Sequence, residues 1–299
     1  MDMFALVAAF GGGAFGALLG ALPAFIMTGC FALAGGLIAA DGGADIGVGF
    51  MAFGSFMGPH VAFAGGVAAA AYAGKKGSLK AGNDIVTALN GLGEADVICV
   101  GGLFGVIGFI ICNLILMTPL GPLTDAVALT VAISGCIARL AFGKTGLLGK
   151  YAGKEPRVWI MGGKGFTYNV MLGAVVGIAV SFVAASMKKA GVPDAALGVY
   201  PVICFGFSAI SLIFAQTGFA IPATHHITLP SGLGAIAGIA AWGPEGAILG
   251  VLIGIISSVY GDLMGNSFNS HNDSHIDPPA LTIFMMTILV NLIRIAIIK

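Results

Sequence analysis

The sequence predicts an all-α integral membrane protein, and three observations carry this prediction. Hydrophobic residues make up 58% of the 299 residues, only 9% are charged, and the mean hydropathy is +1.03. Apolar runs of about 20 residues, the length that a helix needs to cross a bilayer, recur along the chain. The 49 glycines suit the close packing of membrane helices, because small residues let two backbones approach each other.

We expect about ten hydrophobic segments. Six are regular apolar runs, at 3–20, 95–118, 123–143, 166–187, 195–216 and 280–298. Four contain or follow Pro or Gly breaks, at 22–41, 46–74, 220–241 and 245–262. Segments 22–41 and 220–241 are predicted to be broken or re-entrant, because interrupted backbone at membrane depth is tolerated only where protein or water surrounds it.

Several unusual strings recur in the same order, which predicts two homologous repeats. ALPA at 21–24 returns as AIPA at 220–223, and IICNLI at 110–115 returns as ILVNLI at 288–293. A third pair consists of 58–66 and 243–251, which both begin with Gly-Pro. We therefore expect a first membrane repeat at 1–143, a cytoplasmic linker at 144–165 and a second membrane repeat at 166–299.

The Lys and Arg residues concentrate in 75–94 and 144–165, so both loops are expected in the cytoplasm. If 22–41 and 220–241 are re-entrant, the repeats are inverted, both termini face the cytoplasm and 262–279 faces outside. If both segments cross fully, the repeats are parallel. The inverted arrangement places more positive charge inside, and we favour it.

Segment 220–241 is the strongest candidate for a solute site, because it is apolar-flanked, broken by Pro and Gly, and polar. Interrupted segments in matching positions of two repeats commonly bind the substrate in transporters. The alternative is a kinked helix with satisfied histidines. The predicted substrate-binding residues are Thr28, Gly29, Thr224, His225, His226, Thr228, Ser231 and Gly232.

The stretch 261–279 is the second candidate, because it is rich in His, Asp and Asn. His271, Asp273 and His275 are predicted to bind a metal, and the alternative is a solvated loop. We expect coupling or gating roles for the residues at matched or helix-start positions, His60, Asn83, Glu94, Asp262, Asn266 and Asp277. Asp125 and Arg139 lie at opposite ends of one apolar run, so both are expected to extend to the membrane surfaces.

The sequence predicts a transporter or channel for a small polar or ionic solute, and histidines near neutrality could couple transport to protons or ions. The alternatives are a membrane-embedded metal-dependent enzyme that uses 261–279, and a membrane subunit of a larger complex. A bound cation or divalent metal is the only cofactor suggested. The expected partners are the bilayer, the solute and further copies of the chain, and the expected location is the cytoplasmic membrane of a prokaryote. Thirteen Lys and Arg balance thirteen Asp and Glu, which argues against nucleic-acid binding.

Overall fold

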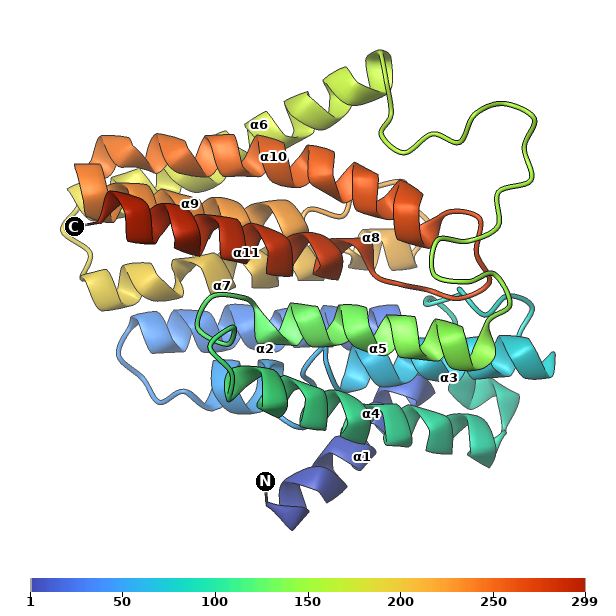
Figure 1. Ribbon diagram of the computed structural model, residues 1–299. Coiled ribbons are helices and arrows are strands. Elements are labelled where there is room, and N and C mark those ends of the chain that lie inside the picture. The colour runs from blue at the N-terminus through green and yellow to red at the C-terminus, as the bar shows by residue number, and fades with distance from the viewer. Residues whose placement is uncertain (1, 299) are drawn as a thin grey trace.

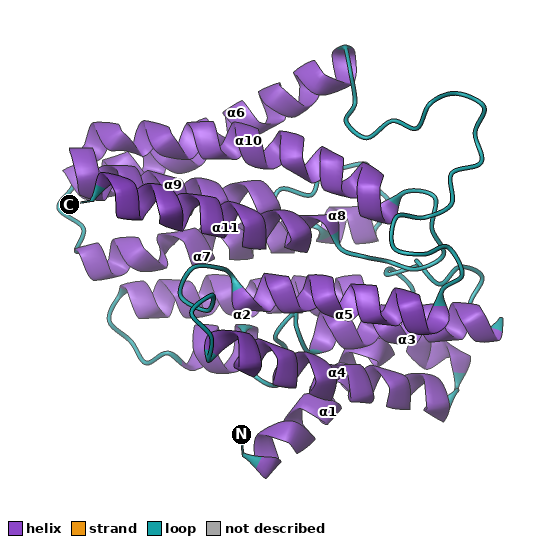
Figure 2. Ribbon diagram, in the orientation of Figure 1, coloured by secondary structure: helices purple, strands orange, loops and turns teal. Residues whose placement is uncertain are grey.

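The computed structural model describes residues 2–298, and all regular structure within them is helical (Figure 2). The longer helices of the first half are α1 (Met3–Leu19), α2 (Ala21–Ala40), α3 (Ala62–Lys76), α4 (Ala95–Leu116) and α5 (Ala126–Phe142). Those of the second half are α6 (Lys164–Lys189), α7 (Asp194–Ser211), α9 (His225–Trp242), α10 (Ile248–Met264) and α11 (Pro278–Ile297). The short elements are α8 (Ile213–Gln216), η1 (Ile46–Ala52), η2 (Leu89–Leu92), η3 (Pro244–Ala247) and η4 (Gly265–Asn269).

The described helices have the length and surface of a membrane protein. Six helical stretches are long and apolar enough to cross a bilayer, and α1 and α5 are shorter apolar helices. Large apolar side chains such as Phe4, Phe182 and Phe207 are more than two-thirds exposed. Extended apolar surface of this kind is rare on soluble monomers. These features are those of a helical multi-pass membrane protein, as the composition predicts.

The long helices run roughly along one common direction and form one bundle (Figure 1). In the first half α1, α3 and α4 pack on one another, and in the second half α6, α9 and α10 do the same. The two halves meet where α2 packs along α7 and where α5 contacts α11. In Figure 1, α3 and α5 run from the middle of the bundle towards the right, whereas α9 and α11 run towards the left.

The predicted break within 22–41 is wrong, because α2 is a continuous helix from Ala21 to Ala40. Pro23 lies in its first turn, where a missing backbone N–H costs nothing because that group has no partner within the helix. In the second segment the interruption precedes the helix. Residues 217–224 are not helical, and α9 then runs through Pro230 without a break.

The loops predicted on opposite sides of the membrane lie at the same end of the bundle. The Asp273 carboxylate accepts hydrogen bonds from the Lys144 N–H at 2.6 Å and from the Thr145 hydroxyl at 2.8 Å. The backbone carbonyl of Asp273 also lies against Gly82, where a Cβ would come within 2.6 Å of it. The placement of 262–279 opposite 75–94 is therefore wrong. We call this end, which carries residues 77–94, 143–163, 217–224 and 265–277, the lysine-rich end.

Arg139 does not extend to a surface, contrary to the sequence prediction. Its side chain is 1% exposed and donates to the carbonyl oxygens of Leu147, Phe268 and Ser274 at 2.6–2.7 Å, and to the Ser274 hydroxyl at 2.9 Å. A guanidinium carries five N–H donors in a fixed plane, so one side chain can hold several carbonyl groups. Arg139 thereby ties the end of α5 to the loop before α11.

Candidate solute site

A cavity of about 40 Å³ lies in the middle of the bundle, where several helices begin. It is lined from the first turns of α3, α5, α9 and α11, from the second turn of α2 at Phe25, and from the middle of α7 at Phe205. The wall carries four phenylalanines, one imidazole and two carboxylates, supplied by Phe25, Phe53, Phe63, Phe205, His225, Asp125 and Asp277. It is a mainly apolar chamber with two acidic groups on the side formed by α5 and α11.

The two carboxylates occupy the same local position on their helices. Asp125 precedes α5 and accepts a hydrogen bond from the Ala128 N–H at 2.8 Å. Asp277 precedes α11 and accepts from the Ala280 N–H at 2.8 Å. An Asp at this position satisfies one of the N–H groups that a helix start leaves free, and its charge opposes the positive end of the helix dipole. The cap fixes each carboxylate at the cavity wall.

Two histidines accompany Asp277. The Nε2 atom of His275 lies 3.1 Å from an Asp277 carboxylate oxygen, and the side chains are 8% and 15% exposed. The His225 ring packs on Phe25, with 4.8 Å between ring centroids, and is 4% exposed. Its Nδ1 atom has no hydrogen-bond partner within residues 2–298. A buried imidazole nitrogen without a partner is costly, and the ring that carries this one lines the cavity.

A second cavity of about 240 Å³ adjoins the first. The two share Phe25, Phe63, His225 and Asp277 as wall residues. The second cavity continues towards the lysine-rich end, where Ile85, Ile221, Ala223, Pro278 and Pro279 line it. A small solute at Asp277 could therefore extend into the larger space.

Of the eight predicted substrate-binding residues, only His225 lines either cavity. The Thr28 hydroxyl donates to the Met57 carbonyl at 2.6 Å, and the Thr228 hydroxyl donates to that of Cys204 at 3.3 Å. Gly29 packs on α7 at Ala209. Ser231 and Gly232 are buried against α10 and α7, while Thr224 precedes α9 without capping it through its side chain. His226 packs on Gly261 of α10.

Consecutive residues on a helix point about 100° apart, so a His-His pair cannot turn both rings to one cavity. This geometry explains why His225 reaches the cavity while its neighbour His226 lies against α10. The centroids of the two imidazole rings are 6.0 Å apart, and the ring planes are nearly perpendicular. His226 therefore lies outside the cavity walls, although the sequence predicts both histidines as substrate-binding residues.

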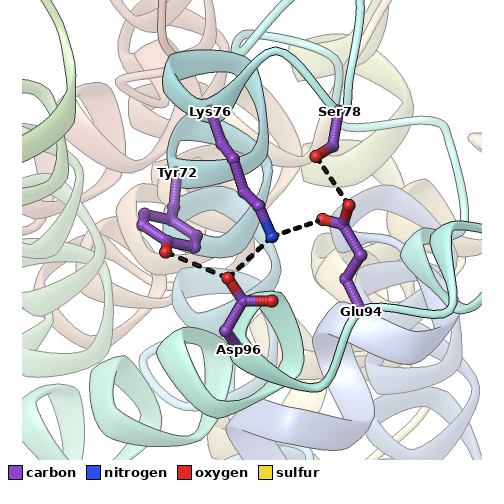
Figure 3. A network of polar contacts seen from close by, with 5 residues as sticks. All are labelled: Tyr72, Lys76, Ser78, Glu94 and Asp96. Carbon is purple, nitrogen blue, oxygen red and sulfur yellow. Dashed lines mark hydrogen bonds and ion pairs between the residues drawn. The ribbon is translucent and has the colours of Figure 1, made fainter.

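The residues predicted for coupling or gating are dispersed. Glu94 belongs to a polar cluster that joins the end of α3 to the start of α4 (Figure 3). In that cluster the Lys76 ammonium lies 3.2 Å from the Glu94 carboxylate and 2.8 Å from that of Asp96. The Ser78 and Tyr72 hydroxyls donate to the same two acids at 2.8 and 3.1 Å. These contacts hold the end of α3 against the start of α4 at the lysine-rich end.

Asp262 accepts a hydrogen bond from the Asn266 side chain at 3.1 Å, and also accepts the Met161 N–H at 2.8 Å. His60 is 3% exposed beneath Gly108 of α4, before the start of α3. Asn83 lies near Asp273 in a polar pocket at the lysine-rich end. Only Asp277, of the six residues in this group, lines the central cavity.

The three predicted metal ligands have separate partners. The His271 ring packs on Tyr151, the Asp273 carboxylate binds the Lys144 N–H, and His275 binds Asp277. Within residues 2–298 no three His, Cys, Asp or Glu side chains are grouped so as to hold a metal ion. The loop 265–277 thus serves contacts within the chain in this structure.

Asp125 and the phenylalanines of the cavity are the site residues that sequence reasoning missed. Asp125 stands directly before an apolar run, as Asp277 does, and this shared helix-start position was the available signal. The phenylalanines gave no signal, because 20 of them are spread over an apolar chain.

One protein-family model, described as a family of unknown function (DUF7973), matches the chain twice, over residues 1–157 and 157–298. No curated protein and no solved structure matches it.

Proposed function

We propose that this chain, which belongs to the DUF7973 family, is a membrane transporter that moves a small polar or ionic solute through the central cavity. The observation that carries the proposal is the convergence of helix starts on that cavity. First-turn residues of α3, α5, α9 and α11 line it, and the helices leave it in two opposite directions. Helices that begin at mid-membrane around one small chamber are the usual construction of solute sites in secondary transporters.

Two inverted repeats form part of this proposal, and the packing of glycines supports them. In the first half Gly13 of α1 packs against Gly101 and Gly105 of α4. In the second half Gly177 of α6 packs against Gly250 and Gly254 of α10. Gly65 of α3 packs against the first group, and Ser231 of α9 packs against the second. Such close contacts between small residues hold membrane helices together.

This pairing matches α3 with α9 and α5 with α11, and these paired helices run in opposite directions in Figure 1. It differs from the register of the repeated strings, which would match the start of α3 with the start of α10. The double match of one family model also favours a duplication. In this arrangement ten helices cross the membrane, and α2 with α7 and α5 with α11 form the interface around the solute.

The orientation follows from the distribution of Lys and Arg. Lys75, Lys80, Lys144, Lys150 and Arg157 all belong to the lysine-rich end or its border, which we therefore assign to the cytoplasm. With five crossings in each half, both termini lie on the opposite side, which reverses the expectation from the sequence that they face the cytoplasm. The second cavity then faces the cytoplasm.

Cysteine accessibility tests this proposal without knowledge of the solute. In a variant that lacks the five native cysteines, Ala128→Cys or Ile283→Cys places a thiol at the cavity wall. Two small membrane-impermeant thiol reagents, one cationic and one anionic, are applied to liposomes. At least one of them should modify these thiols from both sides, because the cavity alternates its access. Val175→Cys is the control, since Val175 is 57% exposed on the outer face of α6, where lipid would exclude both reagents. Cavity thiols that resist both reagents from both sides would contradict transport through this site.

A further inference from the structure

We infer that the central cavity binds the ammonium group of a small organic cation. This inference rests on the proposed function and names the class of solute that the same site would take. It depends on three features of the cavity wall: the arrangement of aromatic rings, the two carboxylates that line the same cavity, and one imidazole nitrogen that lacks a partner.

The aromatic rings form a continuous wall. Phe25 lies between Phe63 and Phe205, with ring centroids 5.7 and 5.6 Å apart, and Phe53 follows at 5.6 Å from Phe205. All four rings line the cavity. The face of an aromatic ring attracts a cation within about 6 Å, and the attraction is strongest where water is excluded. A buried set of rings around a small chamber is therefore suited to an ammonium head.

The carboxylates supply the countercharge. Asp125 and Asp277 line the cavity from α5 and α11, and each also caps its own helix. A carboxylate carries a charge of −1, whereas the helix N-terminus that it caps carries an effective charge of about +0.5. About half of the negative charge is therefore left to attract a ligand. Each carboxylate also has roughly four lone-pair sites, and the cap, together with His275 Nε2 at Asp277, occupies only some of them. The remaining sites can accept hydrogen bonds from N–H donors of a bound ammonium.

His225 is the independent sign of a ligand. Its ring is 4% exposed, lines both cavities, and leaves Nδ1 without a hydrogen-bond partner in the described chain. With Nε2 protonated, Nδ1 is an acceptor that an N–H donor of the solute could satisfy. The polar groups of the cavity wall are therefore hydrogen-bond acceptors, and a cation that carries N–H donors would satisfy them.

Other ligand classes fit this wall less well. A divalent metal ion such as Ca²⁺ or Mg²⁺ takes about six or more oxygen ligands, whereas most of this wall is aromatic or aliphatic. An anion would meet Asp125 and Asp277 directly. The size also limits the head group: about 40 Å³ holds roughly three water molecules, enough for an ammonium with one or two carbons. The rest of the solute would extend from Asp277 into the 240 Å³ cavity.

The probe is n-butylammonium, with butyrate and 1-butanol as matched anionic and neutral compounds. Calorimetry on the purified full chain in detergent should show binding of n-butylammonium and none of butyrate at equal ionic strength. Asp125→Asn and Asp277→Asn should each weaken binding about tenfold or more, because Asn keeps the helix cap but removes the charge. Phe25→Leu should weaken it roughly fivefold, the scale of one cation–π contact. Asp194→Asn is the control, since Asp194 pairs with Lys188 on the surface and should leave binding unchanged.

The inference is overturned if the wild-type chain fails to bind n-butylammonium, if butyrate binds more tightly, or if both Asn variants bind as the wild type does. Thermal melting of each variant shows whether it has folded, and Asp277→Glu offers a charge-retaining variant should Asp277→Asn fail to fold. If n-butylammonium does not bind but the cavity thiols are still labelled from both sides, the transporter proposal stands without the ammonium inference. Failure of the thiol labelling alone would contradict the transporter and leave an ammonium-binding membrane protein.

Discussion

Asp125 and Asp277 cap two helices that start at one cavity and run in opposite directions. Each carboxylate accepts the backbone N–H three residues further on at 2.8 Å, and each faces the same chamber. The pair therefore has two roles: it stabilises the starts of α5 and α11, and it sets the charge of the cavity. Substitutions can separate these roles, because Asn retains the cap and Ala does not.

Asp125→Ala and Asp277→Ala should each lower the free energy of unfolding by about 1 kcal/mol, the usual loss when a helix cap is removed. The corresponding Asn variants should stay close to the wild type. Thermal melting of the purified variants in detergent measures the difference. Asp41→Ala, an exposed change at the end of α2, is the control. Equal melting temperatures for the Ala and Asn variants would argue against the capping role.

Thiols introduced at the two loops of the lysine-rich end should react from the same side of the membrane. In the background without native cysteines, Lys80→Cys and His271→Cys are both exposed positions, and Asp194→Cys lies at the other end of the bundle. An impermeant maleimide applied to sealed, oriented vesicles should label the first two together and the third from the opposite side. Labelling of Lys80→Cys and His271→Cys from different sides would contradict the fold.

Arg139→Met should destabilise the protein strongly, by roughly 3 kcal/mol or more, because it leaves the carbonyls of Leu147, Phe268 and Ser274 without donors. Arg139→Lys should recover only part of the loss, since one ammonium cannot reach all these acceptors. Melting in detergent measures both variants, with the exposed Arg294→Ala as control. A fully stable Arg139→Met variant would show that the loop before α11 is held by other contacts.

Gly13→Ala should destabilise the first half, because a Cβ at Gly13 would collide with the Gly101 carbonyl and with the Gly105 backbone. Gly11→Ala is the matched control on the same helix, since a Cβ there meets nothing within 4 Å. That control should be neutral or slightly stabilising, because Ala has the higher helix propensity. Melting temperatures compare the two directly. Similar values would mean that α1 and α4 are less tightly packed than described.

The contact of Asp273 with 144–145 should depend on pH. Burial raises the pKa of Asp273, but hydrogen bonds from the Thr145 hydroxyl and the Lys144 N–H outweigh it and hold the pKa below its ordinary value. A carboxyl with a lowered folded-state pKa stabilises the protein above its unfolded pKa of about 3.9, and this contribution is lost as the pH falls through the folded-state pKa. Asp273→Ala should thus melt below the wild type at neutral pH, and the gap should close in acid. A gap that stays constant with pH would exclude this carboxylate as its source.

The sequence predicted the membrane class and most helices, because long apolar runs leave little choice of structure. α4, α6, α7 and α11 lie within a few residues of the predicted runs. The depth at which a helix begins could not be predicted. α3 has 15 residues and α5 has 17, fewer than the roughly 20 of a full crossing, yet apolarity alone does not tell a helix that starts inside the bundle from one that starts at its surface.

This limit explains the misplacement of Asp125 and Arg139. Taken as the ends of one complete crossing, both were expected at the surfaces, whereas the first lies at the central cavity and the second under the loops 143–149 and 268–274. The cavity itself depends on contacts between α2, α7 and the starts of four other helices. Such contacts join residues far apart in the chain, and no local pattern specifies them.

The link between the halves is the segment from Tyr151 to Pro156, which is fully on the surface. Within this segment the Tyr151 hydroxyl donates to the Glu155 carbonyl at 2.7 Å. Before it α5 ends, and after it α6 begins, at the same end of the bundle (Figure 1). A cut between Ala152 and Lys154 would remove no helix and expose no buried surface. The two pieces could therefore be made as separate polypeptides and assemble in one membrane, each inserted with its own orientation.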